Sequence, residues 1–326
     1  MTKILLIQTA FIGDVILATA NVEALHTAFP TAKIDFLLRK GNENLLEGHP
    51  FLNKVLVWDK KQKKRQNMWA MIRQIRAERY DLVINLQRFF STGLITTLSK
   101  GKTKVGFDKN PWSLFFDIKK THEIGNDTHE VTRNLSLLTD WRTEEMCLPK
   151  LYPSADSFAK AKKIVAQYAQ KYICIAPTSV WFTKQLPAQK WIELIQNLPQ
   201  THTIFLLGAP SDKAACQVIL EQSQCANVVN LAGKLNLLDS AALMRDAHMN
   251  YVNDSAPLHL CSAMNAPVTA VFCSTVPRFG FTPLSDNSRV VEVKKTLDCR
   301  PCGLHGFKAC PKGHFNCAKI AVADLV

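Results

Sequence analysis

Residues 3–38 read KILLIQTAFIGDVILATANVEALHTAFPTAKIDFLL, and this stretch decides the fold class. An apolar run, Lys3–Ile7, precedes a turn that contains Gly13. Over Val15–Ala28 the apolar residues recur every three or four positions, which predicts a helix. A second apolar run, Lys33–Leu38, predicts another strand. A strand, a helix and a strand in succession indicate a right-handed βαβ unit and a parallel sheet.

The same alternation continues along the chain on both sides of a polar, proline-containing stretch, Glu144–Asp156, which we interpret as a linker. We therefore expect an α/β protein with two doubly wound, Rossmann-like parallel-sheet domains, residues 1–152 and 153–326, facing across a cleft that holds the ligands. The predicted strands are Val55–Trp58, Leu82–Leu86, Tyr172–Ala176, Thr203–Leu207, Val228–Leu231, Met249–Val252 and Val268–Phe272. The predicted helices are Trp69–Arg79, Ser91–Ser99, Ser157–Gln170, Ala188–Leu198, Asp212–Ser223, Leu238–Ala247 and Pro257–Met264.

Composition and charge narrow the class of protein. The 326 residues are 47% hydrophobic and 21% charged, which excludes a disordered chain or a disulfide-stapled miniprotein. The N-terminus does not have the pattern of a signal peptide, and no apolar run is long enough to span a membrane, so we expect a cytoplasmic protein, peripheral at the inner membrane face at most. The net charge is +13, with lysine clusters in the first half at 60–65, 100–104 and 119–120. Such a charge favours nucleic acid, anionic membrane or phosphorylated substrates, the alternative being an inert basic surface.

Asp14 is the candidate functional residue of the first domain. It follows the first predicted strand and lies at or near the start of the next helix. One interpretation is a helix cap, because a carboxylate there accepts amide hydrogen bonds and interacts favourably with the helix dipole. The other is a carboxylate at the mouth of the cleft that takes a proton from an incoming hydroxyl.

Two loops of the second domain carry polar residues that suit a phosphate. The loop after its first strand contains Thr178, Ser179 and Lys184. A later strand is followed by Asp254 and Ser255 at a predicted helix start, where free N–H groups bind anions. Capping by Asp254 and Ser255, and a core position for His259, are the structural alternatives. Neither a Walker A nor a GxGxxG pattern occurs, which disfavours nucleotide hydrolases and Rossmann dehydrogenases.

The order of these motifs resembles glycosyltransferase family 9, the heptosyltransferase family of lipopolysaccharide core assembly. The matching features cover nearly the whole chain: Ile4–Ile7 with Gly13-Asp14-Val15-Ile16, Lys184 before Leu186-Pro187, Leu207-Gly208-Ala209, Leu231-Ala232-Gly233-Lys234, Asn253-Asp254-Ser255-Ala256-Pro257-Leu258-His259-Leu260, Ala266-Pro267-Val268 and Phe272. The resemblance implies a GT-B fold, with an acceptor-binding N-terminal domain and a nucleotide-sugar-binding C-terminal domain. It also implies an inverting transfer that uses no metal and no cofactor.

Residue by residue, the resemblance implies a general base at Asp14. The positions that match the family's donor site hold the diphosphate, the ribose, the adenine and the sugar: Thr178, Ser179 and Lys184 for the diphosphate, Asp212 for the ribose, Leu235 for the adenine, and Asp254, Ser255, Ala256 and His259 beside the diphosphate and sugar. At two of these positions the chain departs from the family's habit. Ala256 stands where glycine is usual, and Asp212 is shorter than the usual glutamate.

The last four of the ten cysteines form a separate pattern, Cys299-x2-Cys302-x7-Cys310-x6-Cys317, with two histidines interleaved. The spacing has the C-x2-C start of a zinc site but not the tight second pair of a zinc ribbon. A similar pattern recurs in the family that the chain resembles, without a catalytic metal. Structural zinc, reduced thiols and a redox role stay open from the sequence.

We therefore predict a glycosyltransferase that moves a heptose or related sugar from an ADP-activated donor to a phosphorylated glycolipid acceptor of lipopolysaccharide core type, with transient contact to an anionic membrane. The alternatives are a glycosyltransferase that uses another nucleotide sugar, and a non-catalytic nucleotide-sugar-binding protein on the same fold. A nucleic-acid-binding protein is disfavoured, because the basic clusters lack interleaved aromatic residues.

Overall fold

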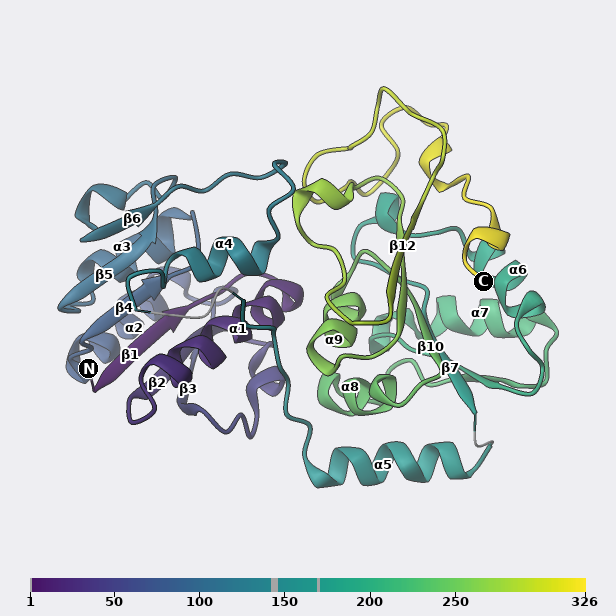
Figure 1. Ribbon diagram of the computed structural model, residues 1–326, viewed down its shortest axis with the longest axis horizontal. Coiled ribbons are helices and arrows are strands. Elements are labelled where there is room, and N and C mark those ends of the chain that lie inside the picture. Colours follow the sequence, from purple (N-terminus) through teal and green to yellow (C-terminus); the bar gives the residue numbers. More distant parts are fainter. Residues whose placement is uncertain (1, 142–145, 169–170) are drawn as a thin grey trace. The chain divides into compact units, whose positions relative to one another are not determined.

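The computed structural model describes residues 2–141, 146–168 and 171–326, and the chain divides into two compact units. Unit 1 is Met1–Tyr152 and unit 2 is Pro153–Val326. Each unit contains a six-stranded, all-parallel sheet with helices on both faces (Figure 1). The doubly wound α/β fold class predicted from the alternating pattern is confirmed.

Unit 1 is ordered β3-β2-β1-β4-β5-β6 in its sheet. The helix α1 packs on α4, and α2 packs on α3, so that each face of the sheet carries a helix pair. The elements are β1 Lys3–Ile7, α1 Ile12–Ala28, β2 Lys33–Arg39, η1 Glu43–Leu46, β3 Leu52–Trp58, α2 Lys64–Glu78, β4 Leu82–Asn85, α3 Phe90–Leu98, β5 Thr103–Phe107, η2 Ser113–Phe115, β6 Ile118–Lys120 and α4 Glu130–Ser136, where η marks a short 3₁₀ helix.

Unit 2 is ordered β12-β11-β10-β7-β8-β9. Here α8 packs on α5 and α9, and α6 packs on α7. The elements are α5 Ala155–Ala166, β7 Tyr172–Ala176, η3 Phe182–Lys184, α6 Ala188–Asn197, β8 Thr203–Leu206, η4 Pro210–Asp212, α7 Lys213–Ser223, β9 Val228–Asn230, α8 Leu237–Arg245, β10 Met249–Asn253, α9 Ala256–Met264, β11 Val268–Phe272, η5 Pro277–Phe279, β12 Ser288–Glu292, η6 Asn316–Ala318 and η7 Val322–Asp324.

The two sheets share one topology. When the strands of each unit are numbered from its own first strand, both sheets have the order 3-2-1-4-5-6. The chain reverses its direction of travel across the sheet between the first and fourth strands, which are β1 and β4 in unit 1 and β7 and β10 in unit 2. In open parallel sheets, ligands bind at the carboxyl ends of the strands beside this reversal. The topology therefore marks one candidate edge in each unit.

Apolar packing on both faces holds these edges in place. In unit 1, Trp58 and Ile72 belong to a buried cluster between the sheet and α2. In unit 2, Trp191 and Ile195 belong to a cluster between the sheet and α6. The strands β1 and β7 are almost wholly buried, as expected for parallel strands covered on both sides.

Among the described strands and α-helices, four are absent from the sequence prediction: β5, β6, α4 and β12. They are short or rich in polar residues, and therefore lack a clear apolar period. The predicted helix Ser157–Gln170 is placed too late, because α5 runs over Ala155–Ala166, and its predicted end at 169–170 lies outside the described residues. Among the described helices, none is both long and apolar enough to cross a membrane.

Candidate functional site

The switch point of unit 2 carries a buried ion pair. Lys184 ends η3 after β7, and Asp254 directly follows β10. Lys184 Nζ lies 2.7 Å from Asp254 Oδ2, with the two side chains 15% and 6% exposed. Thr275 Oγ1, after β11, donates to the same carboxylate oxygen at 2.6 Å. These contacts join the ends of three neighbouring strands and hold the ammonium group of Lys184 beside the helix that follows.

That helix, α9, begins next to the ion pair. Ser255 is its N-cap residue, Ala256 its first residue, and Pro257 lies in its first turn. The first amides of a helix have no partner within it, and together with the helix dipole they attract an anion. His259 is buried one turn further along, 6.3 Å from the ring of Phe281 between centroids. An ammonium group and a helix N-terminus at one switch point form a site suited to a phosphate or diphosphate.

Hydrogen bonds to buried groups fix the loop that contains Thr178 and Ser179. Gln185 Nε2 donates to the Ser179 carbonyl at 2.6 Å, and the Leu186 amide donates to Asn253 Oδ1 at 2.9 Å. Thr178 and Ser179 are half-buried. Because Asn253 ends β10, the loop is tied to the strand that carries Asp254.

The Cys-rich segment supports the same loop from another side. The Phe307 amide donates to Thr183 Oγ1 at 2.8 Å, and Ser274 Oγ donates to that oxygen at 3.0 Å. Gly306 has a positive φ of 77°, and a Cβ there would lie 2.8 Å from Thr183 Oγ1 and 3.1 Å from Lys184 Cγ. This position therefore requires glycine for its conformation and for the close approach to Lys184.

Asp212 and Leu235 lie on neighbouring loops at the ends of β8 and β9. The Gly233 amide donates to the Gly208 carbonyl at 2.9 Å and ties the two loops together. Asp212 Oδ2 accepts the Ala209 amide at 2.8 Å and so caps η4. Leu235 is half-buried just before α8. The structure thus brings Lys184, Asp254, Ser255 and Ala256 to one switch point. Along the same edge, Asp212 follows the strand next to β7, and Leu235 follows the strand after that.

In unit 1, Asp14 lies in the first turn of α1. Phe11 is the N-cap residue, and its amide donates to Asp14 Oδ2 at 3.1 Å. Asp14 is half-exposed, and its Oδ2 accepts the capping hydrogen bond. The expected turn at Gly13 is wrong: the helix begins at Ile12, and Gly13 does not have a positive φ.

Cationic side chains at the ends of β2 and β3 surround the same edge. Lys60 Nζ donates to the Thr9 carbonyl at 3.0 Å and to Thr9 Oγ1 at 2.6 Å. Burial, together with the nearby charges of Arg39 and Lys64, lowers the pKa of Lys60 to about 8. The Arg39 guanidinium lies 4.8 Å from the centroid of the Phe11 ring. A bound anion would relieve the repulsion among these cations, and the edge is therefore suited to an acidic ligand.

A buried carboxylate on α4 faces this edge. Glu130 Oε2 accepts from Arg133 Nε at 2.9 Å and pairs with Nη2 at 2.8 Å. Burial raises the pKa of Glu130 to about 7, against the attraction of Arg133 and with the repulsion of Asp14. Ionisation of Glu130 near neutral pH thus adds a negative charge that repels the carboxylate of Asp14.

The sequence analysis did not single out Arg39, Arg133 or Glu130. Arg39 is the last residue of β2, so inspection of every strand end could have found it. Arg133 and Glu130 belong to a helix that the apolar pattern does not predict. Their spacing of three residues, which lets opposite charges pair on one face of a helix, was the sequence signal that could have indicated this ion pair.

The four C-terminal cysteines are free thiols. Cys299 Sγ lies 3.9 Å from His314 Nε2, and Cys310 Sγ accepts the Phe315 amide at 3.4 Å. Burial acts to raise the pKa of Cys310, but several backbone N–H groups, led by that of Phe315, outweigh it and lower the pKa. Within the described residues, no group of three or more His, Cys, Asp or Glu is arranged to hold a metal ion.

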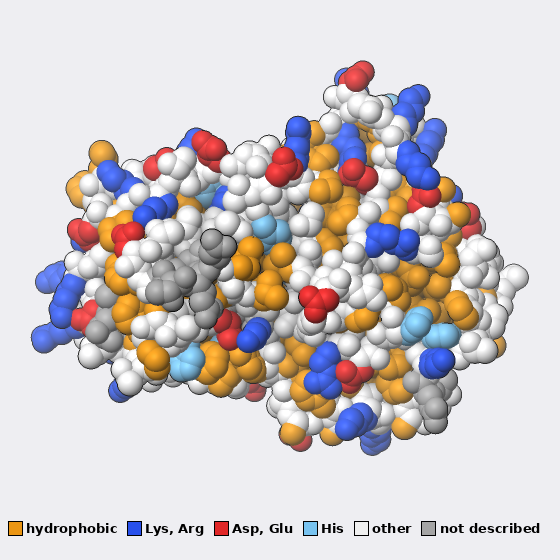
Figure 2. Space-filling view, viewed as in Figure 1, with side chains coloured by type: hydrophobic (Ala, Val, Ile, Leu, Met, Phe, Trp, Pro, Cys, Tyr) orange, Lys and Arg blue, Asp and Glu red, His pale blue; other side chains and the backbone are white. Residues whose placement is uncertain are grey.

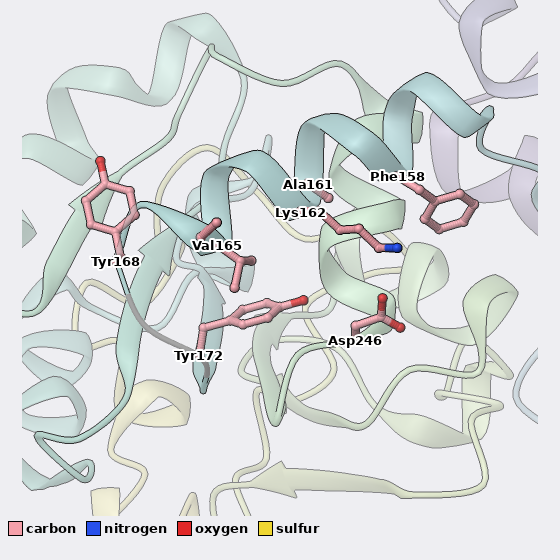
Figure 3. A pocket seen from close by; sticks show the side chains of 8 residues that line it. Phe158, Ala161, Lys162, Val165, Tyr168, Tyr172 and Asp246 are labelled. Atoms are coloured by element: carbon pink, nitrogen blue, oxygen red, sulfur yellow. The ribbon is translucent and has the colours of Figure 1, made fainter.

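A pocket of unit 2 lies at the opposite edge of its sheet. Its volume is about 430 Å³, and it is lined by α5 residues together with Tyr172 and Asp246. Figure 3 shows Phe158, Lys162 and Val165 of α5 facing those two side chains. Because Tyr172 starts β7, this pocket is at the amino end of the strands and contains none of the predicted donor residues.

Comparisons with known proteins identify the family of this chain and support its fold. A family model described as Glycosyltransferase family 9 (heptosyltransferase) matches residues 68–305, more than half of the chain. The chain is 29% identical over 290 residues to lipopolysaccharide heptosyltransferase 3 of Escherichia coli, covering 85% of each chain. The fold matches the ADP-heptose lps heptosyltransferase II of E. coli, with a TM-score of 0.78, 21% identity and coverage of 92% and 96%. It also matches the family 9 glycosyltransferase of Veillonella parvula, with a TM-score of 0.81, 20% identity and coverage of 90% and 86%.

Proposed function

The chain belongs to glycosyltransferase family 9, the heptosyltransferase family, and we propose that it transfers a heptose from ADP-heptose to a phosphorylated glycolipid acceptor of lipopolysaccharide core type. The names of its relatives support this substrate class, since lipopolysaccharide heptosyltransferase 3 and the ADP-heptose-dependent enzyme of E. coli are among them. The observation that carries the proposal is the Lys184–Asp254 pair at the start of α9, at the switch point of unit 2.

In this proposal, unit 2 binds the nucleotide sugar. Lys184 and the first amides of α9 meet the diphosphate, with Thr178 and Ser179 as hydroxyl donors. Asp212 contacts the ribose, and Leu235 packs against the adenine. Ser255, Ala256 and His259 lie beside the diphosphate and sugar, and Asp254 holds Lys184 in place. Ala256 adds a methyl group at the first residue of α9, where the family usually has glycine. In this proposal, that methyl group reduces the room beside the diphosphate and so affects which sugar the site accepts.

Unit 1 would bind the acceptor. Arg39, Lys60 and Lys64 form a cationic group at the ends of β2 and β3, suited to the phosphates of a lipopolysaccharide core. Asp14 lies at the end of the neighbouring strand β1, and one of its oxygens already accepts the Phe11 amide. We propose that the Asp14 carboxylate accepts the proton of the attacking hydroxyl.

The proposed reaction is a single displacement. The acceptor oxygen attacks the anomeric carbon of the heptose, the bond to the diphosphate breaks, and the hydroxyl proton passes to Asp14. Attack from the side opposite the leaving group inverts the anomeric centre. Lys184 and the helix amides stabilise the charge that develops on the leaving ADP, and we propose that the reaction needs no metal ion.

The direct test is transfer in a defined mixture of the purified chain, ADP-heptose and lipopolysaccharide core acceptors that lack successive heptoses. We expect ADP release with a heptose mass added to one acceptor, and the same rate after treatment with EDTA. A parallel reaction with UDP-, GDP- and dTDP-sugars tests the donor. Transfer from one of these, but not from ADP-heptose, would replace the proposed donor, and no transfer from any donor would contradict the proposal.

A further inference from the structure

A group of large apolar side chains is exposed beside the proposed acceptor edge of unit 1. Phe89 and Phe90 begin α3 after β4, and Trp112, Leu114 and Phe115 form the turn after β5. We name these five residues the aromatic platform. Four of them are strongly exposed, at 56% for Phe89, 60% for Phe90, 84% for Leu114 and 56% for Phe115. Exposed apolar residues gathered in this way mark an interaction surface.

The platform is held together by specific contacts. Ring centroids lie 5.2 Å apart for Phe90 and Trp112, and 5.8 Å apart for Trp112 and Phe115. Asn110 Nδ2 donates to the carbonyls of Gln87 at 2.9 Å and Phe89 at 3.3 Å, which ties the two loops to each other. The two segments therefore present their apolar side chains as one surface.

A glycine permits this close packing. A Cβ at Gly93 of α3 would lie 2.0 Å from Asn110 Oδ1 and 2.9 Å from Trp112 Cδ1. Any side chain there would separate α3 from the turn after β5. The absence of a side chain at 93 is thus required for the two halves of the platform to meet.

Basic side chains lie on the platform loops and on the adjacent strand β6. Arg88 directly precedes Phe89, and its charge acts on the buried carboxylate of Glu130. Lys109 and Lys119 are exposed, and neither forms an ion pair with another described residue. The nearby carboxylates are engaged, because Asp108 accepts the His122 amide at 3.1 Å and Asp117 pairs with Lys104 at 3.1 Å. Figure 2 shows hydrophobic side chains next to both basic and acidic side chains where Figure 1 labels β6 and α3.

We propose that the aromatic platform inserts into the interface of an anionic lipid bilayer. Phe and Trp side chains are favoured at the boundary between headgroups and acyl chains, and exposed lysines such as Lys109 and Lys119 attract acidic headgroups. A second copy of this chain fits the surface less well, because each copy has a net charge of +13 and the copies repel one another.

The platform lies where docking would serve the proposed reaction. Strands β1, β4 and β5 are adjacent in the sheet, so their carboxyl ends lie side by side. Asp14 follows β1, and the platform follows β4 and β5. This inference rests on the proposed function in one respect: docking there would bring a glycolipid acceptor in the bilayer to the edge that carries Asp14.

The test is vesicle binding by the full chain and two double variants. The platform variant is Phe90→Ser with Leu114→Ser. The control is Tyr168→Ser with Val218→Ser, which removes two exposed side chains of unit 2. Flotation with phosphatidylcholine vesicles that contain about 30 mol % phosphatidylglycerol measures binding. We expect the unchanged chain and the control to bind, and the platform variant to bind about 100-fold more weakly.

Stabilisation by ADP, measured on the same samples, separates this inference from the proposed function. Equal ADP stabilisation in all three proteins, with loss of vesicle binding in the platform variant, supports the inference. If the unchanged chain binds vesicles but is not stabilised by ADP, the inference of membrane docking is retained and the proposed donor is contradicted. Equal vesicle binding by the platform variant, or no binding by the unchanged chain, would overturn the inference. So would a shift from dimer to monomer in the platform variant, because the surface would then join two copies.

Discussion

The carboxyl edges of the two sheets share a strand order but not a chemistry. In unit 2 the cation at the edge is already paired, since Lys184 contacts Asp254 and both side chains are nearly buried. In unit 1 the cations at the edge face one another, and the pKa of Lys60 is lowered by burial and by its neighbours Arg39 and Lys64. In unit 2 a carboxylate balances the charge of the edge cation, whereas in unit 1 Lys60 is held by the uncharged groups of Thr9, and the edge suits an acidic ligand.

This difference shows that the topology and the side chains determine different properties of a ligand site. The strand order 3-2-1-4-5-6 determines where a ligand can bind in each unit. The residues at the strand ends determine which ligand it is. A tight nucleotide site gains from groups held in place before binding. A site for a large phosphorylated acceptor gains from exposed cations and apolar side chains.

The largest expected effect is on catalysis by Asp14. Asp14→Asn keeps an oxygen that can accept the Phe11 amide but removes the proposed base. We expect kcat to fall by about 10²–10⁴-fold with the Kd for ADP unchanged. Steady-state kinetics and ADP titration measure the two quantities.

Asp239→Asn is the control for capping, because Asp239 holds the corresponding position in α8. That substitution also breaks the ion pair of Asp239 with Lys160. We expect that variant to retain normal kcat. If the two variants lose stability alike and both retain kcat, Asp14 is a helix cap and not the base.

The next effect is on stability and follows from Glu130. Its pKa is raised from 4.5 to about 7, so between these values the folded state binds more protons than the unfolded state. The free energy of unfolding therefore falls as pH rises through that window, by up to about 3 kcal/mol for the full shift. Glu130→Gln should flatten this part of the curve. Urea unfolding from pH 5 to 8 measures it, and an unchanged slope in the variant would show that Glu130 is not the cause.

Nucleotide binding is expected to depend on Lys184. Lys184→Met removes the ammonium and leaves the Asp254 carboxylate buried without its cation. We expect the Kd for ADP to rise about 10–100-fold. Lys190→Met, which breaks the exposed pair with Glu193 on α6, should leave the Kd unchanged. Wild-type affinity in Lys184→Met would remove Lys184 from the donor site.

The smallest expected effect is on two glycines of the Cys-rich segment, and comparing them distinguishes backbone strain from steric contact with the donor loop. Gly306→Ala adds both, and Gly303→Ala adds positive-φ strain with Phe307 Cζ no nearer than 3.7 Å. Each should lower the free energy of unfolding by about 1–2 kcal/mol. Gly306→Ala should in addition weaken ADP binding several-fold, because its Cβ would displace Thr183 and Lys184. Equal ADP affinity in the two variants would mean that the Cys-rich segment does not support the donor loop.

The sequence predicted the parts of the fold that have a strong apolar period. The runs at 3–7 and 172–176 are buried strands, and each is a short, continuous apolar run followed by polar or turn residues. Strand β6 has three residues, two of them lysines, and no local pattern marks it. It forms because β5 offers it a sheet edge. Short edge elements of this kind depend on tertiary contacts more than on their own residues.

The candidate site divides in the same way. Lys184 and Asp254 follow predicted strands, so the sequence could place both at one edge. Their direct contact, and its support by Thr275 and Gly306, depends on side chains from distant segments. The burial of Glu130 could not be predicted from the sequence of its own helix. That helix, α4, is largely polar, and it is buried because it packs on α1.

Hydrogen exchange with and without ADP tests most directly whether the nucleotide binds at the edge of unit 2 and not at the edge of unit 1. We predict that ADP slows amide exchange in unit 2, at residues 177–186, 208–213 and 254–260, and leaves the strand ends of unit 1 unchanged. Protection at the strand ends of unit 1 with none in unit 2, or no protection in either unit, would contradict this account.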